Sequence, residues 1–207
     1  MRAWTAHRFD AMCLVAAALG TMFLIGCGPA TGIHDPAMLA SARTLAVFPA
    51  AGAPGPDGQN AGPMQASMLI TSLSNLQYYQ VQGPGQFRRA LASQPAEGGP
   101  WNPAVQAKTA AELGIDLLVL SDLADYRFTK DNKSSYWVVG SSSWTESTFY
   151  ATVNLRLVDP KDGRVVYSGS GMAESKLGYG PAIQQANEMA LRELTDFVAK
   201  QPPRQAK

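Results

Sequence analysis

The sequence predicts a single α+β domain in which helices pack on a mixed β-sheet of about five strands. Three observations support this. Short apolar runs at Thr44–Phe48 and Leu117–Leu120 are typical of buried strands. Phe149–Val158 alternates between apolar and polar residues, as expected of a strand with one exposed face. Apolar residues also recur at helical spacing in residues 64–76 and 181–200. The expected order of elements is β-α-β-(α)-α-β-β-β-α.

In the first half, the strand at residues 44–48 ends at Pro49, and a loop rich in Gly, Pro and Ala precedes the helix at residues 64–76. A second strand is expected over residues 77–81. A short helix over residues 86–93 carries Arg88 and Arg89, which we interpret as part of a solvated helix face.

In the second half, Asn102-Pro103 predicts the start of a helix, and Gly114 predicts its end. A buried strand should follow over residues 115–125. Asp122 and Asp125 have opposite parity on that strand, so we expect them on opposite faces and unsuited to act as an acid–base pair.

The strand over residues 149–158 should form a hairpin with residues 164–170. Asp159-Pro-Lys-Asp-Gly163 supplies the turn, because Pro presets φ and Gly accepts positive φ. Pro181 is expected to begin one final helix. Residues 201–207 are expected to form a frayed polar tail. The buried stripe of that helix is predicted to consist of Ile183, Ala186, Ala190, Leu194 and Phe197.

The N-terminus has the pattern of a cleaved lipoprotein signal. Residues 1–26 begin with basic residues and continue with a short apolar run, and the lipobox Leu24-Ile25-Gly26 precedes Cys27. We expect Cys27 to be the lipidated (palmitate-bearing) first residue of the mature chain, because two or more acyl chains give stable membrane anchoring. Residues 27–43 are interpreted as a flexible tether in which His34 is solvated. Gly28 after the cysteine favours the outer membrane.

Composition excludes several classes of function. Of 17 basic and 16 acidic residues, Arg2, Arg8 and Asp10 lie in the signal, which leaves 15 of each and no basic face for a nucleic acid. Because Cys13 lies in the signal too, the mature chain has no thiol to pair and His34 is its single histidine. We therefore predict no disulfide, metal site, cofactor or catalytic nucleophile pair.

The segment Lys130–Ser147 is unusual because aromatic residues stand in a polar, Ser-rich stretch between two expected strands. Aromatic rings with one apolar and one polar edge favour membrane surfaces and protein interfaces. Packing of these rings on the core is the alternative. The residues predicted to contact a membrane or a partner are Tyr136, Trp137, Val138, Val139 and Trp144.

Three segments resemble a known family. They are the opening strand Thr44-Leu-Ala-Val-Phe-Pro49, the helix-to-strand segment Ala110–Leu120 and the strand–turn–strand Val153–Tyr167. They resemble the curli-production assembly/transport (CsgG-type) group, which includes the lipoprotein activator of penicillin-binding proteins and the Pel export lipoprotein. The resemblance assigns residues 44–200 to a CsgG/TolB-N-like α+β domain.

The resemblance implies a non-enzymatic accessory factor of an envelope export or cell-wall complex, lipid-anchored on the periplasmic face of the outer membrane. Its partners would be the membrane, through the acyl chains, and an envelope protein. One alternative is a subunit of a ring-forming, curli-type secretion channel. However, residues 130–148 offer one membrane excursion and Gly171–Gly180 is too short for a second. The remaining alternative is a hydrolase using carboxylates such as Glu146, Asp159 and Glu174.

Overall fold

A six-stranded mixed sheet organises the part of the chain that the computed structural model describes, residues 31–48, 60–92, 103–137 and 140–204. All of these residues belong to the unit Thr31–Lys207. The spatial order of the strands is β1-β6-β5-β4-β2-β3. β2 is parallel to its neighbours β3 and β4. The other neighbouring pairs, β4 with β5, β5 with β6 and β6 with β1, are antiparallel. The strands are β1 (Gly32–Ile33), β2 (Thr44–Val47), β3 (Gln80–Gln82), β4 (Leu117–Trp137), β5 (Gly140–Val158) and β6 (Val165–Ser175).

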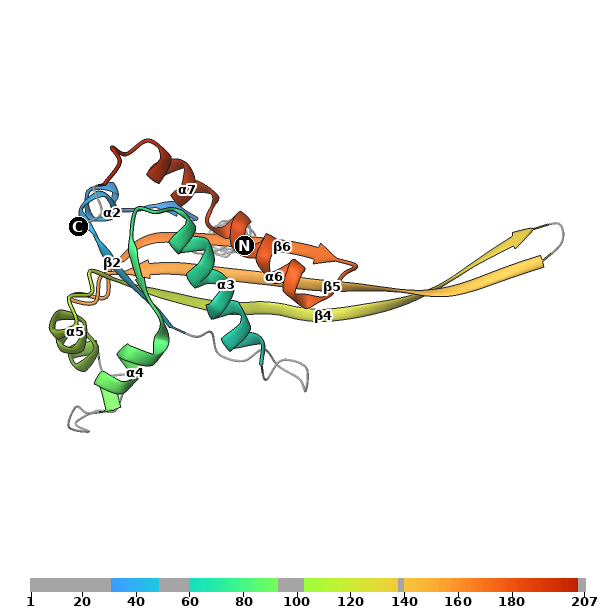
Figure 1. The fold of residues 1–207 in the computed structure, drawn as a ribbon, viewed down its shortest axis with the longest axis horizontal. Coiled ribbons are helices and arrows are strands. Elements are labelled where there is room, and N and C mark those ends of the chain that lie inside the picture. Colours follow the sequence, from blue (N-terminus) through green and yellow to red (C-terminus); the bar gives the residue numbers. More distant parts are fainter. Residues whose placement is uncertain (1–30, 49–59, 93–102, 138–139, 205–207) are drawn as a thin grey trace, which may run out of the picture. The chain divides into compact units, whose positions relative to one another are not determined.

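Most helices cover one side of this sheet, which we call the helix face. Figure 1 shows α3 and α6 lying side by side across it. Their apolar residues pack on those that β2, β4, β5 and β6 turn inward, among them Leu117, Leu155 and Tyr167. The helices are α2 (Pro36–Ser41), α3 (Ala61–Asn75), α4 (Pro84–Ala92), α5 (Pro103–Glu112), α6 (Tyr179–Ala190) and α7 (Arg192–Ala199).

A smaller cluster lies on the other side of the sheet, where Phe87 of α4 and Ala110 of α5 pack against Ala46 and Leu118. The described residues therefore form the predicted single α+β domain, with six strands instead of about five. The expected turn chemistry is also confirmed, because Gly114 and Gly163 have φ of 63° and 73°. None of the helices in the described part of the chain is both long and apolar enough to cross a bilayer.

The extra strand overturns the tether prediction for residues 32–42. β1 pairs with β6, and α2 begins after Asp35, whose side chain accepts a hydrogen bond from the Met38 amide at 2.9 Å. Leu39 is fully buried, whereas His34 is exposed as predicted, with its ring Nε2 2.8 Å from the Ser168 hydroxyl. The β1–β6 pairing and the His34–Ser168 contact join residues more than 130 positions apart, which local composition cannot reveal.

Three smaller predictions were also wrong. The strand expected over residues 77–81 begins only at Gln80, because Gln77 has a φ of 52° and turns the chain. The final helix divides into α6 and α7 at Leu191, although the first four residues of its predicted stripe are buried. The tail is not frayed throughout, because Arg204 docks on α2, as described below.

Candidate interaction surface

The predicted excursion at residues 130–147 is the far half of a long β-hairpin. β4 and β5 pair continuously from Leu118↔Val158 to Trp137↔Gly140. β6 accompanies them only as far as Phe149↔Ser175, so residues 129–137 and 140–148 form a two-stranded extension that we call the arm. At about 3.3 Å per residue the arm is roughly 30 Å long. Figure 1 shows it leaving the helix-covered part of the sheet.

The pleat of the arm fixes which way its side chains point. Tyr126 pairs with buried Ala151 on the helix face, and Tyr136 has the same parity as Tyr126. Trp144 pairs with Lys133 and has the opposite parity, so it lies on the other face, which we call the open face. Tyr136 is 84% exposed and Trp144 is 50% exposed. These two aromatic residues are therefore solvent-accessible on opposite faces of the arm.

The arm lacks the apolar band that a lipid-facing strand presents. Lys130 lies on the helix face, while Asp131, Lys133 and Glu146 lie on the open face. The cross-strand neighbours are mostly Ser, Thr and Asn, which pair with one another: the Ser135 and Ser142 hydroxyls are 2.9 Å apart. On a lipid-facing strand each Lys or Arg side chain costs about 2–4 kcal/mol at the bilayer centre, and each Asp or Glu costs less. The polar and charged side chains on both faces of the arm thus favour contact with water or with a polar partner.

Aromatic residues hold the root of the arm on the helix face. The rings of Tyr126 and Tyr179 stack with centroids 3.9 Å apart, and Phe149 meets Tyr179 edge-on at 4.9 Å. Phe128, 41% exposed, stacks on Phe149 at 6.0 Å. Since Tyr179 begins α6, this cluster connects the two strands of the arm to the helix layer.

An ion cluster holds the root on the open face. Glu146 accepts hydrogen bonds from Lys133 across the arm and from Lys176 in the connection after β6. The two lysines lower the pKa of Glu146 from 4.5 to about 2, mainly by these hydrogen bonds. The cluster therefore links both strands of the arm to the body of the domain.

This geometry predicts how the ion cluster responds to pH. Because the folded pKa of Glu146 lies below its ordinary value, the cluster is fully formed above about pH 4.5 and is lost as the pH falls towards 2. The carboxyl carbon resonance of Glu146 should titrate with a midpoint near 2. In a Lys133→Met, Lys176→Met double variant the midpoint should return towards 4.5. A wild-type midpoint near 4.5 would contradict the cluster.

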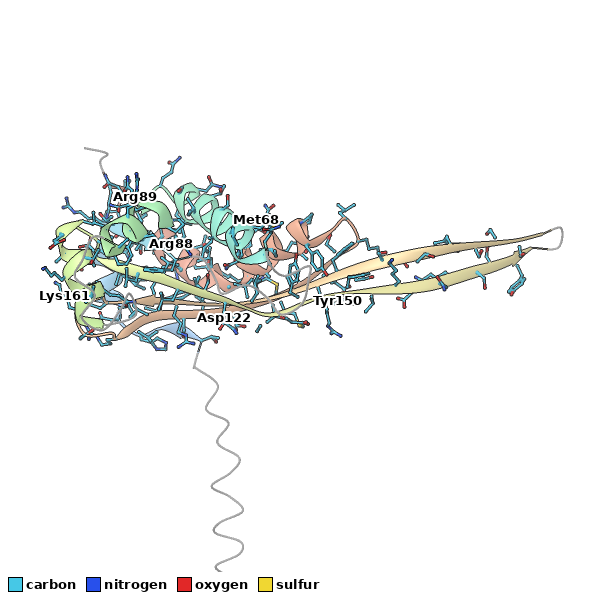
Figure 2. The ribbon with its side chains drawn as sticks, turned by 90° about the horizontal axis from the view of Figure 1, so that it is seen from below. Met68, Arg88, Arg89, Asp122, Tyr150 and Lys161 are labelled. Atoms are coloured by element: carbon cyan, nitrogen blue, oxygen red, sulfur yellow. The ribbon has the colours of Figure 1, made fainter. Side chains whose placement is uncertain are left out.

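The remaining open face carries a polar line across three strands. The Asn154 amide donates to Asp122 at 3.0 Å, and the Ser170 hydroxyl donates to the Asn154 oxygen at 2.9 Å. Figure 2 shows Asp122 and Tyr150 on this side of the sheet and Met68 on the other. A bulge between Leu123 and Asp125 reverses the parity, so Asp122 and Asp125 share the open face, contrary to prediction.

The carboxylates considered for hydrolysis are not gathered. Glu146 is ion-paired with Lys133 and Lys176. Asp159 is buried in the turn after β5, where its carboxylate accepts a hydrogen bond from the Lys161 amide at 2.9 Å. Glu174 faces Tyr150 on the open face. Within the described ranges, no three acidic, histidine or cysteine residues come together in a group that could hold a metal ion.

Several predicted site residues lie outside what the structure describes: the lipobox Leu24-Ile25-Gly26, Cys27, Val138 and Val139. For Trp137 the backbone is described, paired with Gly140, and the side chain is not. The sequence prediction named Tyr136 and Trp144, which are exposed on the arm, and missed the contacts of Glu146 and Tyr179 at its root. Residues 140–148 show no alternation of apolar and polar residues, so no local signal indicated that the strand continued outward.

The fold and this surface define a class: an α+β domain whose central hairpin extends beyond its helix layer. No protein-family model and no curated protein matches the sequence. Solved structures with a similar fold include the PelC dodecamer from Paraburkholderia phytofirmans, with 16% identity over 83% of this chain and 96% of that chain and a TM-score of 0.47.

Two others are the lipoprotein GNA1162 from Neisseria meningitidis and the LpoB C-terminal domain from Escherichia coli. The first has 18% identity over 77% of this chain and 99% of that chain, with a TM-score of 0.44. The second has 14% identity over 75% of this chain and 93% of that chain, with a TM-score of 0.39. Because all three scores are below 0.5, we draw no functional conclusion from them. The resemblance to the curli-production group stays a prediction.

Proposed function

We propose that this protein is a lipid-anchored accessory factor of the bacterial envelope that holds a protein partner with its arm and catalyses no reaction. Cys27 would carry the acyl chains and anchor the domain to the outer membrane on its periplasmic side. The arm would supply the contact through Tyr136, Trp144 and the residues at its end. Both parts of the proposal extend the sequence prediction, which named the same residues.

The observation that carries the proposal is the arm itself. A two-stranded hairpin without a third strand or a covering layer is only marginally stable in water. This one continues beyond the last residue of β6 and keeps Tyr136 and Trp144 exposed. A partner that covers both faces of the arm would supply the missing layers and bury the two aromatic side chains, which are of the type enriched at protein interfaces.

A protein partner accounts for the chemistry of the arm better than lipid does. Charged residues stand on both faces, and Ser, Thr and Asn fill most of the remaining positions. The same chemistry weighs against the alternative of a curli-type channel subunit, whose hairpins would need a lipid-facing side. The three carboxylates considered for the hydrolase alternative, Glu146, Asp159 and Glu174, are not paired with one another.

The test is a Tyr136→Ser, Trp144→Ser double variant expressed with its own signal sequence. Both side chains are exposed, so the urea midpoint should stay within error of the wild type. Chemical cross-linking in intact cells should yield a discrete adduct for the wild type and lose it for the variant. The matched control is Met189→Ser, which removes a 44% exposed apolar side chain near the end of α6, away from the arm, and should keep the adduct. An unchanged adduct in the double variant would reject the proposed contact.

A further inference from the structure

The segment Gly32–Ala42, which follows the predicted anchor in the sequence, is called the strap. β1 adds two residues to the edge of β6, and the amides of His34 and Asp35 both donate to the Val166 carbonyl, at 2.9 and 3.1 Å. The Asp35 carboxylate also pairs with Arg164 at 3.1 Å. A six-residue helix does not form alone in water, so these tertiary contacts are what keep the strap folded.

The C-terminal end of α2 meets side chains from two other parts of the chain. The Tyr78 hydroxyl donates to the Ala40 carbonyl at 3.1 Å, and the Tyr79 hydroxyl donates to the Leu39 carbonyl at 3.3 Å. Burial raises the pKa of the Tyr79 hydroxyl above its ordinary value, so it remains a proton donor at any physiological pH. α2 has no basic residue in its own last turn to complement these carbonyls.

Arg204, near the C-terminus, supplies that positive charge. Its guanidinium donates to the carbonyl oxygens of Ala40 and Ala42, and to the Tyr78 hydroxyl at 2.9 Å. The guanidinium carbon lies 3.8 Å from the Tyr78 ring centroid and 5.9 Å from that of Tyr79. A planar fork of donors resting on an aromatic face is specific to guanidinium, because an ammonium group cannot make both contacts in one plane.

We propose that Tyr78, Tyr79 and the carbonyl end of α2 form a guanidinium-binding site, and that its occupation by Arg204 latches the strap to the domain. When Arg204 leaves, the carbonyls of Ala40 and Ala42 lose their charged donor. The strap then keeps the short β1 pairing, the Asp35–Arg164 ion pair, the two tyrosine hydroxyl bonds and the burial of Leu39. The strap then opens before the rest of the sheet, as expected of a peripheral segment held by few contacts.

The latch has a consequence that rests on the proposed lipid anchor. With the strap docked, residues 27–31 alone separate the acylated end from the domain, a span of at most about 17 Å. With the strap released, residues 27–43 span up to roughly 60 Å. Binding and release of Arg204 would thus set how far from the bilayer the arm can operate.

Hydrogen exchange on the full chain tests the latch. In Arg204→Ala, the amides of His34, Leu39 and Ala42 should exchange about tenfold faster, the factor expected for loss of a charged hydrogen-bond donor. The amides of Val153 and Leu157 in the central strand should keep their wild-type rates. Millimolar methylguanidinium should restore protection of the strap in the variant, and methylammonium at the same concentration should not.

The matched control is Lys200→Ala, which removes an exposed cation four positions earlier and should leave the strap unchanged. The latch is rejected if Arg204→Ala leaves strap exchange unaltered or accelerates strap and core equally. The guanidinium site is rejected if methylguanidinium restores nothing. Should Arg204→Ala fail to fold, Arg204→Lys replaces it: faster strap exchange supports the site, and wild-type exchange overturns it. Neither lipid nor partner enters these measurements, so they fail independently of the proposed function.

Discussion

A Gly171→Ala variant is expected to lose about 3 kcal/mol of folding free energy, the upper range for overpacking. Gly169 and Gly171 stand on the helix face of β6, where α6 approaches so closely that a side chain has no room. A Cβ at Gly171 would lie 2.0 Å from the carbonyl oxygen of Ala186, and one at Gly169 would lie 1.9 Å from that of Ala190. Both obstructing atoms are helix backbone, so relief requires moving α6 as a whole.

The prediction is tested by comparing the urea unfolding midpoint of Gly171→Ala with that of Gly140→Ala. Gly140 is also a strand glycine, but a Cβ there meets nothing within 4 Å. Its substitution should therefore leave the midpoint near the wild-type value. Similar midpoints for the two variants would mean that the close contact between α6 and β6 does not exist as described.

Removing the arm is expected to abolish partner contact without unfolding the domain. Thr129 and Thr148 face each other across the hairpin, so residues 130–147 can be replaced by an Asn-Gly turn. The replaced residues contribute nothing to the three buried apolar clusters, and the exposed ion pair of Glu146 with Lys176 is worth little to stability. The urea midpoint should hardly change, while the cross-linked adduct disappears.

Two outcomes would contradict this account of the arm. A large fall in the urea midpoint would show that the arm supports the core. An adduct that survives the replacement would show that the partner binds elsewhere, for example on the open face around Asp122. Restoring the full arm with Tyr136 and Trp144 both present should restore the adduct, which controls for expression.

The body of the domain could be predicted because its residues carry local signals. Phe149–Val158 alternates cleanly, and Ala151, Val153, Leu155 and Leu157 are indeed the buried set. The turn after Val158 was identified from Pro160 and Gly163, and Gly163 has the positive φ that this requires. Period and turn chemistry are properties of adjacent residues, so no tertiary information was needed.

The arm was missed as a pair of strands for the opposite reason. Residues 130–148 have polar residues on both faces, so the period-two hydrophobic signal is absent even though the pairing is continuous. The parity error at Asp125 has a similar origin, because one bulge residue reverses the alternation and leaves no mark in the sequence.

Buried polar contacts between distant segments were equally invisible. Gln65 is fully buried in α3, where its side chain accepts from the Ser121 hydroxyl at 2.8 Å and donates to Asn187 at 3.3 Å. Arg204 had no apolar context to suggest docking on α2. In each case the partner is more than 50 positions away, and the interaction emerges only when the sheet brings the segments together.

Site-specific photo-cross-linking from position 136 tests the central claim, that the arm contacts a protein partner in the envelope. A photoreactive residue replaces Tyr136 in the full chain, and a second chain carries it at Lys161, an exposed position in the turn at the other end of β5 (Figure 2). We expect one discrete adduct from position 136 and none from position 161. Its mass separates a different protein from a second copy of this chain. No protein adduct from position 136, or equal adducts from both positions, would mean that the arm does not contact a protein partner.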